Sequence, residues 1–484
     1  MKVPELRHRI LFTLAMIVVV RLGVQIPLPG IDVMELQKVI EASANASGPG
    51  AGLATVLTIF SGGGLQQCGI FALGIMPYIS ASIMTQLLSA VVPQWAKMVR
   101  EEGGRQKMTK WTRAIAIVIA IVQGWFLVGT LEHPDRLKAV GLNIPPDCQL
   151  VIDPGMQFAL MTVLIMVAGT MFLMWIGDQI TERGVGNGVS LIISVNIIHA
   201  LPGAVTLAWK TLVYKDGAVV PMGAMLLVAL IAFLIIVVAL VVTVTQAQRR
   251  IPVQYAKRVM GNKMFNGATQ YLPLKLNYSG VMPVIFATAI LSLPQVLFSQ
   301  IAHYNTTLQW IATKMNDWMN PASSGYYIIS GLMIFFFSYF WVATMFQPSQ
   351  IAEDLKRNGG PPTALFLDQT MQRLTFAGSA FLTLIYFLPS LLNIGGSIPY
   401  LVTQFFGGTS LLILVGVLLD MMRQVETTLL SRNYDGFLKK GKLKGKYGHI
   451  QGTGAAAGSR TVTVMWVVIA LLVLAGAIAY NAMQ

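Results

Sequence analysis

Histidine and cysteine are the residue types whose spacing would reveal a metal site or a redox pair. The sequence contains two cysteines, Cys68 and Cys148, and five widely separated histidines, His8, His133, His199, His303 and His449. No His-x-x-x-His or Cys-x-x-Cys pair occurs in it, so neither a zinc site nor a redox dithiol is predicted. No motif brings a nucleophile together with a base. The sequence therefore predicts a protein that is not an enzyme and that uses no metal and no cofactor.

A glycine-rich string at residues 184–188 (GVGNG) is the feature closest to a phosphate-binding loop. Such a loop follows a β-strand and carries a Lys-Ser or Lys-Thr pair. This string instead follows an apolar segment and lacks that pair. We therefore expect a tight turn between two membrane helices and no nucleotide hydrolysis.

The elements that must position these residues are long apolar segments. Charged residues make up 11% of the 484 residues and apolar residues 55%, with a formal net charge of +14 and a mean hydropathy of +0.65. Soluble domains carry about 25% charged residues, so the composition predicts a multi-pass membrane protein. A bilayer core of about 30 Å requires about 20 apolar residues in a helix. Eleven such windows predict an all-α fold, at residues 10–26, 69–92, 114–131, 156–177, 189–208, 222–245, 281–302, 326–346, 376–394, 398–419 and 461–480.

The distribution of lysine and arginine predicts the orientation. Most of them fall at the N-terminus and in every second loop, with the largest clusters at Lys97 to Arg113, Arg249 to Lys275 and Arg423 to Arg460. Positive charge retains a loop in the cytoplasm. We expect a bacterial cytoplasmic membrane protein with its N-terminus inside, and with its C-terminus outside if the eleventh window spans. Arg21 lies within the first window and is interpreted as structural, reaching the interface or bonding to helix carbonyls.

An internal repeat relates the second predicted span to the seventh. Residues 74–81 (GIMPYISA) match residues 280–287 (GVMPVIFA) at Gly, Met, Pro, Ile and Ala. The copies are five spans apart, an odd number, so the two halves are expected to be inverted relative to each other. Pro77 and Pro283 are expected to kink their helices. Paired, interrupted spans in two inverted halves mark the functional centre of many transport proteins.

Six longer strings carry a family resemblance. They are residues 26–32 (IPLPGID), 71–88 (FALGIMPYISASIMTQLL), 180–190 (ITERGVGNGVS), 248–257 (QRRIPVQYAK), 272–275 (LPLK) and 407–413 (GGTSLLI). In their order, and over residues 1 to about 446, these strings resemble the SecY family, the central subunits of bacterial protein translocases.

The resemblance implies ten helices in two inverted halves around an hourglass-shaped pore for unfolded polypeptide. The second and seventh helices, with Pro77 and Pro283, would form a lateral gate toward lipid. By motif position, the family's apolar pore ring falls on Ile75, Ile79, Val189, Ile193, Ile285 and Ile413. A ring of this kind gates by dewetting when it is closed. The family's plug falls on residues 53–64, including Leu53 and Phe60, with a hinge at Gly62, Gly63 and Gly64.

The resemblance also implies that two basic cytoplasmic loops receive the ribosome or the SecA motor ATPase. The matching residues are Arg249, Arg250, Lys257 and Arg258 in the first loop, and Lys356 and Arg357 in the second. Such side chains suit phosphate or acidic contacts, although positive charge also serves to retain a loop inside. The second loop, residues 348–371, is shorter than in the family and lacks its Pro-Gly-x-Arg-Pro-Gly tip, so Arg357 is a candidate substitute for the missing arginine.

The domain organisation follows from the same resemblance. Residues 1–208 are expected to form the N-terminal half, with helices one to five and the plug, and residues 209–422 the C-terminal half, with helices six to ten. Residues 423–460 are expected to form a basic cytoplasmic tail and linker. Residues 461–484 would add a membrane helix that SecY-like chains normally lack.

The predicted function is the passive conduction of secretory polypeptides across the cytoplasmic membrane and the lateral release of membrane segments into it. The implied partners are SecE-like and SecG-like small subunits, the SecA motor, the ribosome, signal peptides, nascent polypeptides and membrane lipids, with SecDF and YidC as further candidates. Two alternatives remain open. One is an ion-coupled solute carrier with inverted repeats, although the spans show no evident coupling acid, His or Lys. The other is a membrane insertase that never opens a full pore.

Overall fold

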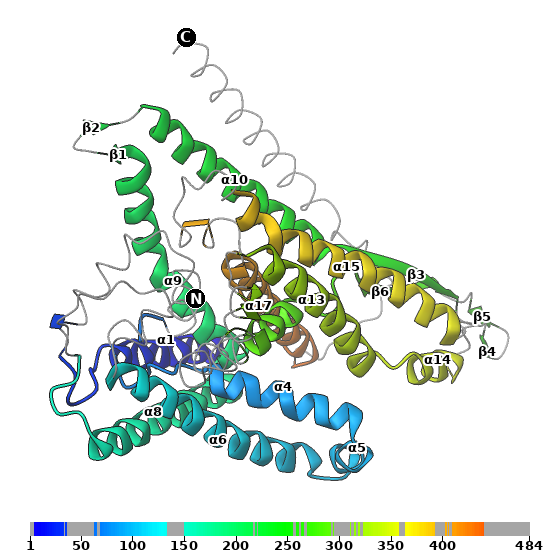
Figure 1. Ribbon diagram of the computed structural model, residues 1–484. Helices are drawn as coiled ribbons and strands as arrows, with labels where there is room; N and C mark the ends of the chain where they lie inside the picture. The colour runs from blue at the N-terminus through cyan, green and yellow to red at the C-terminus, as the bar shows by residue number, and fades with distance from the viewer. Residues whose placement is uncertain are drawn as a thin grey trace.

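Long helices dominate the structure, and short β-hairpins extend from them (Figure 1). The computed structural model describes residues 4–32, 34–35, 62–64, 68–132, 150–215, 218–219, 221–254, 258–260, 263–265, 269–291, 294, 310, 314–315, 318–319, 323–357, 364–392, 402–403, 405 and 409–439. The eleventh predicted span at residues 461–480 lies outside the described residues, as do Leu53, Phe60, Lys257 and Cys148.

The first group of helices packs in a chain of neighbours. It comprises α1 (Pro4–Val24), α4 (Met76–Val91), α5 (Pro93–Arg100), α6 (Gly104–Glu132), α8 (Met156–Arg183) and α9 (Gly188–Ala208). α4 packs on α6, α6 on α8 and α8 on α9, while α1 lies against α8 and α9. α9 continues into a π-helical turn, η1 (Trp209–Val213), so helical structure passes through the boundary predicted at residue 208.

The second group of helices contains the other copy of the repeat. It comprises α10 (Pro221–Gln246), the shorter Met282–Leu291 helix, α13 (Ser324–Met345), α14 (Pro348–Arg357), α15 (Ala364–Leu392) and α17 (Thr409–Lys439). α13 packs on α15, and α10 packs on α17. α17 also lies against α9 and thereby links the two groups. Because α17 continues to Lys439, it extends beyond the boundary predicted at residue 422.

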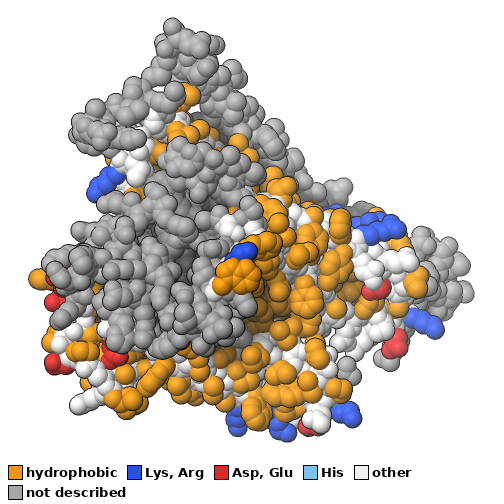
Figure 2. Space-filling view, viewed as in Figure 1, with side chains coloured by type: hydrophobic (Ala, Val, Ile, Leu, Met, Phe, Trp, Pro, Cys, Tyr) orange, Lys and Arg blue, Asp and Glu red, His pale blue; other side chains and the backbone are white. Residues whose placement is uncertain are grey.

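Six of the described helices are long and apolar enough to cross a bilayer, and they fall on predicted windows. They are Gln106–Glu132, Met156–Arg183, Gly188–Leu212, Met225–Gln246, Gly325–Met345 and Ala364–Leu388. Large apolar side chains on these helices, such as Leu164, Val228 and Leu332, are exposed, as expected for surfaces solvated by lipid. Figure 2 shows apolar side chains over the central described part of one face, with most of the visible Lys and Arg toward its margins. These features confirm a multi-pass helical membrane protein.

Antiparallel hairpins occupy the loop after α10, a feature that the all-α prediction missed. β3 (Gln248–Gln254) pairs with β6 (Thr269–Lys275), and β4 (Arg258–Met260) pairs with β5 (Lys263–Phe265) farther out (Figure 1). A smaller pair, β1 (Tyr214–Lys215) and β2 (Ala218–Val219), follows η1. In β3, Ile251 and Val253 are buried while Arg250 and Pro252 are exposed. This alternation is the period-two pattern of a half-buried strand.

Three apolar clusters form the core of the described residues. The largest, called the central cluster here, takes side chains from both groups, on α1, α4, α8, α9, α10, the Met282–Leu291 helix, α13, α15 and α17. A second joins α6 and α8 to the segments around Leu28 and Leu150. The third, called the hairpin cluster, holds the base of the β3–β6 hairpin on α13, α14 and α15.

Candidate pore and docking surfaces

The repeated sequence adopts the same local structure in its two copies. Gly74 and Gly280 have φ values of 58° and 64°, and a helix begins two residues later in each case, at Met76 and at Met282. The left-handed conformation favours glycine, because a Cβ would crowd the following carbonyl group. The repeat seen in the sequence is therefore also a repeat of backbone structure.

The prediction that Pro77 and Pro283 kink their helices is wrong. Each proline lies in the first turn of a helix, Pro77 in α4 and Pro283 in the Met282–Leu291 helix. A proline there removes an N–H group that has no partner within the helix, and its fixed φ favours the helix start. The two prolines therefore mark where the repeated helices begin.

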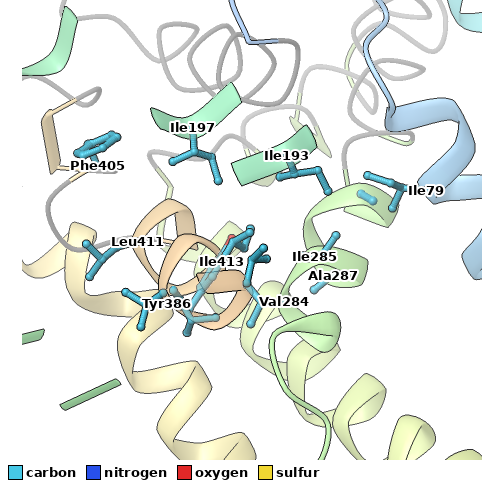
Figure 3. Packing of buried hydrophobic residues seen from close by; sticks show 14 of the residues in the cluster. Ile79, Ile193, Ile197, Val284, Ile285, Ala287, Tyr386, Phe405, Leu411 and Ile413 are labelled. Atoms are coloured by element: carbon cyan, nitrogen blue, oxygen red, sulfur yellow. The ribbon is translucent and has the colours of Figure 1, made fainter. Parts of the chain in front are cut away.

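The six residues predicted for the pore ring all belong to the central cluster or pack against it. Five of them, Ile75, Ile79, Ile193, Ile285 and Ile413, are buried, and Val189 is half-buried against the cluster. Figure 3 shows Ile79 on α4, Ile193 on α9, Ile285 on the Met282–Leu291 helix and Ile413 on α17. Ile79 and Ile285 are equivalent positions of the repeat, so its two copies supply the same residue type to one cluster.

The same cluster contains apolar residues that the sequence did not single out. Ile197, Val284, Phe405 and Leu411 are buried members of this cluster, and Figure 3 draws them together with the predicted ring residues. An apolar residue in an apolar span carries no signal of its own, because lipid contact and helix packing favour the same residue types. Only the folded structure separates these buried positions from exposed ones.

The turn between α8 and α9 is tight, as its glycines predicted. The Asn187 side-chain oxygen accepts hydrogen bonds from the N–H groups of Val189 and Ser190, at 3.1 and 3.3 Å, and so caps α9. A Cβ at Gly188 would lie 1.9 Å from the carbonyl oxygen of Gly177, so the close approach of α8 and α9 requires glycine. This turn fixes the start of α9, which carries the predicted ring residues Val189 and Ile193.

Two hydrogen bonds connect α17 to other parts of the structure. The N–H group of Gly186 donates to the side-chain oxygen of Gln424 at 2.8 Å, a contact called the Gly186–Gln424 joint here. The neighbouring Arg423 donates to the carbonyl oxygen of Thr245 near the end of α10, at 3.2 Å. α17 thus contacts both the turn that starts α9 and the helix that leads into the β3–β6 hairpin.

Arg21 reaches from α1 to the glycine triplet at residues 62–64. Nη1 and Nη2 of Arg21 each donate to the Gly62 carbonyl oxygen at 3.3 Å, and Nη1 also donates to Oδ1 of Asn196 on α9 at 3.2 Å. The partners of Arg21 are therefore a turn carbonyl and a side chain of another helix, rather than the helix carbonyls that the sequence suggested. Asn196 was missed because a single Asn in an apolar helix matches no motif.

The two basic regions predicted to dock a partner share one apolar base. Arg249 and Arg250 are exposed on β3, and Lys356 is exposed on α14. β3, β6 and α14 all contribute to the hairpin cluster on α13 and α15, and Figure 1 shows them toward the same end of these helices. Two loops far apart in sequence are therefore held on one base. The side chains of Arg258 and Arg357 lie outside the described residues.

The structure defines a multi-pass membrane protein with two repeat-related halves. It has membrane-length helices, a structural repeat and a central apolar cluster to which both copies of the repeat contribute side chains. A family model for SecY matches residues 69–422. The protein translocase subunit SecY of Streptomyces coelicolor is 39% identical over 452 residues, which cover 90% of this chain and 98% of that protein. The SecY subunit of Thermotoga maritima is 37% identical over 456 residues, covering 92% and 98%. The chain belongs to the SecY family.

Solved structures share the fold. A protein-conducting channel superposes with a TM-score of 0.55 at 16% identity, covering 89% of this chain and 94% of that chain. Sec61 in a canine ribosome–channel complex superposes with a TM-score of 0.52 at 17% identity, again covering 89% and 94%. A SecY structure that concerns how the plug domain stabilises the closed state gives a TM-score of 0.57 at 16% identity, with the same coverage. The predicted SecY-like helical architecture is thus confirmed.

Proposed function

We propose that the protein is the central subunit of a channel that conducts secretory polypeptides across the bacterial cytoplasmic membrane and releases membrane segments laterally into it. Its family identifies it as a protein translocase subunit. The observation that carries the proposal is the convergence of branched apolar residues from α4, α9, the Met282–Leu291 helix and α17 in one cluster. These elements come from both groups of helices, as a ring between two halves requires.

A ring of branched apolar side chains suits a passive conduit. Such side chains deform around polypeptide of any sequence, and without polypeptide they exclude water and ions by dewetting. In this proposal, residues 53–64 form the plug, and its glycine triplet begins with two residues of positive φ, Gly62 and Gly63. The ring performs no chemistry, so the energy for transport comes from a partner.

α4 and the Met282–Leu291 helix are proposed to form the lateral gate. They are the two copies of the repeat, and both contribute side chains to the central cluster, including Ile83 from α4 and Ala287 from the shorter helix. Separating the two helices would open the cluster toward lipid. A hydrophobic signal sequence or membrane segment could then leave the pore sideways.

The proposed partners are SecE-like and SecG-like subunits, the SecA motor, the ribosome, signal peptides and nascent chains. Two structural relatives, canine Sec61 and the yeast Ssh1 complex with a TM-score of 0.51, were solved with ribosomes. The exposed Arg249 and Arg250 on the shared base of the two loops support docking of a phosphate-rich or acidic partner. The proposed orientation places this base and the N-terminus in the cytoplasm, in accordance with the basic loops.

Reversing the charge of the hairpin is expected to weaken partner docking. The double variant Arg249→Glu with Arg250→Glu should bind ribosomes and the motor about tenfold more weakly at low salt, because exposed interfacial charges mainly steer association. The difference should shrink as salt rises and screens these charges. The measurement is co-sedimentation with ribosomes and binding of the motor over a range of ionic strength.

The control for docking reverses two exposed lysines on α6, Lys107→Glu with Lys110→Glu. It makes the same change in net charge at a different basic loop. Equal weakening in both double variants would show that net charge alone attracts the partner, and would contradict a docking role for the hairpin.

The experiment that tests the proposed function places one cysteine in the ring. In a chain with Cys68→Ser and Cys148→Ser, Ile193→Cys is expected to cross-link to an arrested secretory polypeptide. The matched control is Ile198→Cys on the same helix, because Ile198 is 46% exposed and Ile193 only 1%. The adduct should form at position 193, should require a working signal sequence, and should be near background at position 198.

Absence of an adduct at position 193, with the complex assembled and the polypeptide engaged by its motor, would contradict the channel. Membrane insertion of hydrophobic segments without export of soluble proteins would then favour an insertase. Solute uptake driven by an ion gradient without any partner would favour a carrier.

A further inference from the structure

A half-buried arginine in the last turn of α1 makes polar contacts beside the apolar central cluster. The guanidinium group of Arg21 donates to the Gly62 carbonyl oxygen through both terminal nitrogens, and to Oδ1 of Asn196. Asn196 is almost completely buried, with 3% of its surface exposed. These three groups, called the polar clamp here, join α1, α9 and the glycine triplet.

A charged side chain in a membrane segment is expected to have polar partners and a function. Placing an arginine in the bilayer interior is costly, so such residues pair with other groups and face the interior of the bundle. The N–H groups of Arg21 donate to a carbonyl oxygen of the glycine triplet and to a side chain of α9, although the length of Arg21 would allow it to extend toward water. The hydrogen bonds of Arg21 therefore hold the glycine triplet in place, and they keep a positive charge within the protein.

Gly62 fits the clamp closely. Its φ of 66° is in the left-handed region. A Cβ at this position would lie 2.2 Å from Oδ1 of Asn196 and 2.9 Å from Nη1 of Arg21. The next glycine, Gly63, also has a positive φ of 85°, but a Cβ there would lie 3.4 Å from Nε2 of His199 and would meet no clamp atom within 4 Å. Of these two glycines, Gly62 is therefore the one in direct contact with Arg21 and Asn196.

The clamp borders the central cluster on two helices. Val20 and Val24 are close to Arg21 along α1, and both belong to this cluster. Ile193 and Ile197 flank Asn196 on α9 and belong to the same cluster. The glycine triplet is thus held beside the apolar residues proposed to close the pore.

We propose that Arg21 and Asn196 are positioning residues that hold the glycine triplet in the closed channel and keep the resting channel tight to ions. The proposal rests on the proposed channel function and assigns its closed state to a specific set of hydrogen bonds. Loss of the clamp frees the triplet from α1 and α9, so the seal beside the ring loosens. Ion leak in the absence of polypeptide is the direct readout.

Removing either side chain is expected to raise the leak. In liposomes containing the complete complex, Arg21→Met and Asn196→Leu should each increase the resting flux of small ions by about tenfold or more, because each change breaks partly buried hydrogen bonds to a charged group. Asn196→Asp should remain tight, since a carboxylate oxygen also accepts from the guanidinium group. Ser194→Ala is the control on the same helix: Ser194 is buried, and its hydroxyl donates within α9, to the carbonyl of Ser190 at 3.0 Å.

A double variant distinguishes a clamp from general destabilisation. If Arg21 and Asn196 act as one unit, Arg21→Met combined with Asn196→Leu should leak no more than either single variant. Two independent structural defects would instead add. Additive leak, or equal leak in the Ser194→Ala control, would overturn the proposal.

The two glycines supply a second test that leaves both clamp side chains in place. Gly62→Ala and Gly63→Ala introduce the same strain of a positive φ, but only the first forces a methyl group into the clamp. Gly62→Ala should leak about tenfold or more above Gly63→Ala, comparable to the side-chain variants. Equal leak from the two variants would overturn the proposal, as would an assembled Asn196→Leu complex that stays tight.

The same preparations separate failure of the clamp from failure of the proposed function. Each liposome sample is also tested for the signal-dependent adduct at position 193. If the adducts form and the variants leak no more than the unmodified complex, the clamp is overturned and the proposed channel is not. Absence of adducts even with the unmodified clamp would overturn the channel itself.

Discussion

A covalent bridge between α4 and the Met282–Leu291 helix is expected to reduce polypeptide translocation to background. The bridge is made by cysteine pairs that combine Ile83 or Leu87 of α4 with Met282, in a chain without Cys68 and Cys148. All three side chains belong to the central cluster or pack against it, so the bridge would tie the two copies of the repeat together. The measurement is transport of a signal-bearing protein into vesicles before and after oxidation.

The control for this bridge stays within one group of helices. Thr85 on α4 and Thr112 on α6 have their hydroxyl oxygens 3.0 Å apart, so cysteines there should also form a bridge. Transport should continue in this control, because α4 and α6 need not separate when the gate opens. Full transport with a verified bridge between α4 and the Met282–Leu291 helix would disprove the lateral gate.

Polar substitution in the ring is expected to open the resting channel to ions. Ile193→Asn combined with Ile285→Asn should raise the leak about tenfold or more, because an amide changes the hydration free energy of the ring by more than about 1.4 kcal/mol and favours wetting. The same variant should export proteins with defective signal sequences, since a weakened closed state needs less energy to open. Ion flux in liposomes and export of a signal-defective reporter are the two measurements.

Ile192→Asn is the matched control for the ring. Ile192 and Ile193 are each 1% exposed and belong to the central cluster, but consecutive helical residues point about 100° apart. The control should lower stability through the buried amide and leave the leak unchanged. Leak as large as in the ring variant would mean that any polar group in the cluster admits water, and would remove Ile193 from the ring.

The spans could be predicted from the sequence because length and apolar composition alone determine whether a helix can cross a bilayer. The hairpin could not, since Pro252 and Pro273 interrupt the alternating pattern of its two strands. Proline argues against a central strand, but a two-stranded ladder has only edge strands, where a missing N–H group can face solvent. The basic charge of the loop was therefore recognised and its regular structure was not.

The candidate site also has parts that the sequence predicts and parts that it does not. Four of the six predicted ring residues, Ile75, Ile79, Val189 and Ile413, lie within strings that resemble a known family, and the repeat aligns Ile79 with Ile285. The error about Pro77 arose because the apolar window 69–92 extends across the start of α4, so hydropathy does not show where that helix begins. Pro283 already lies at the third position of its predicted window, 281–302, which matches a first-turn proline. The contact between Arg21 and Asn196 joins distant parts of the chain. No local pattern encodes such a contact.

Because of the Gly186–Gln424 joint, different positions along α17 can move by different distances relative to α9. At 1.5 Å per helical residue, Ile413 lies about 16 Å from Gln424 along α17. While the joint remains closed, a rotation of α17 by about 10° around it moves Ile413 by about 3 Å, yet hardly displaces the turn before α9. If α17 turns about this joint, the predicted ring residue Ile413 is far from the pivot and Arg423 is next to it. A small displacement of the β3–β6 hairpin, which follows α10 and its contact with Arg423, would then become a larger displacement at Ile413.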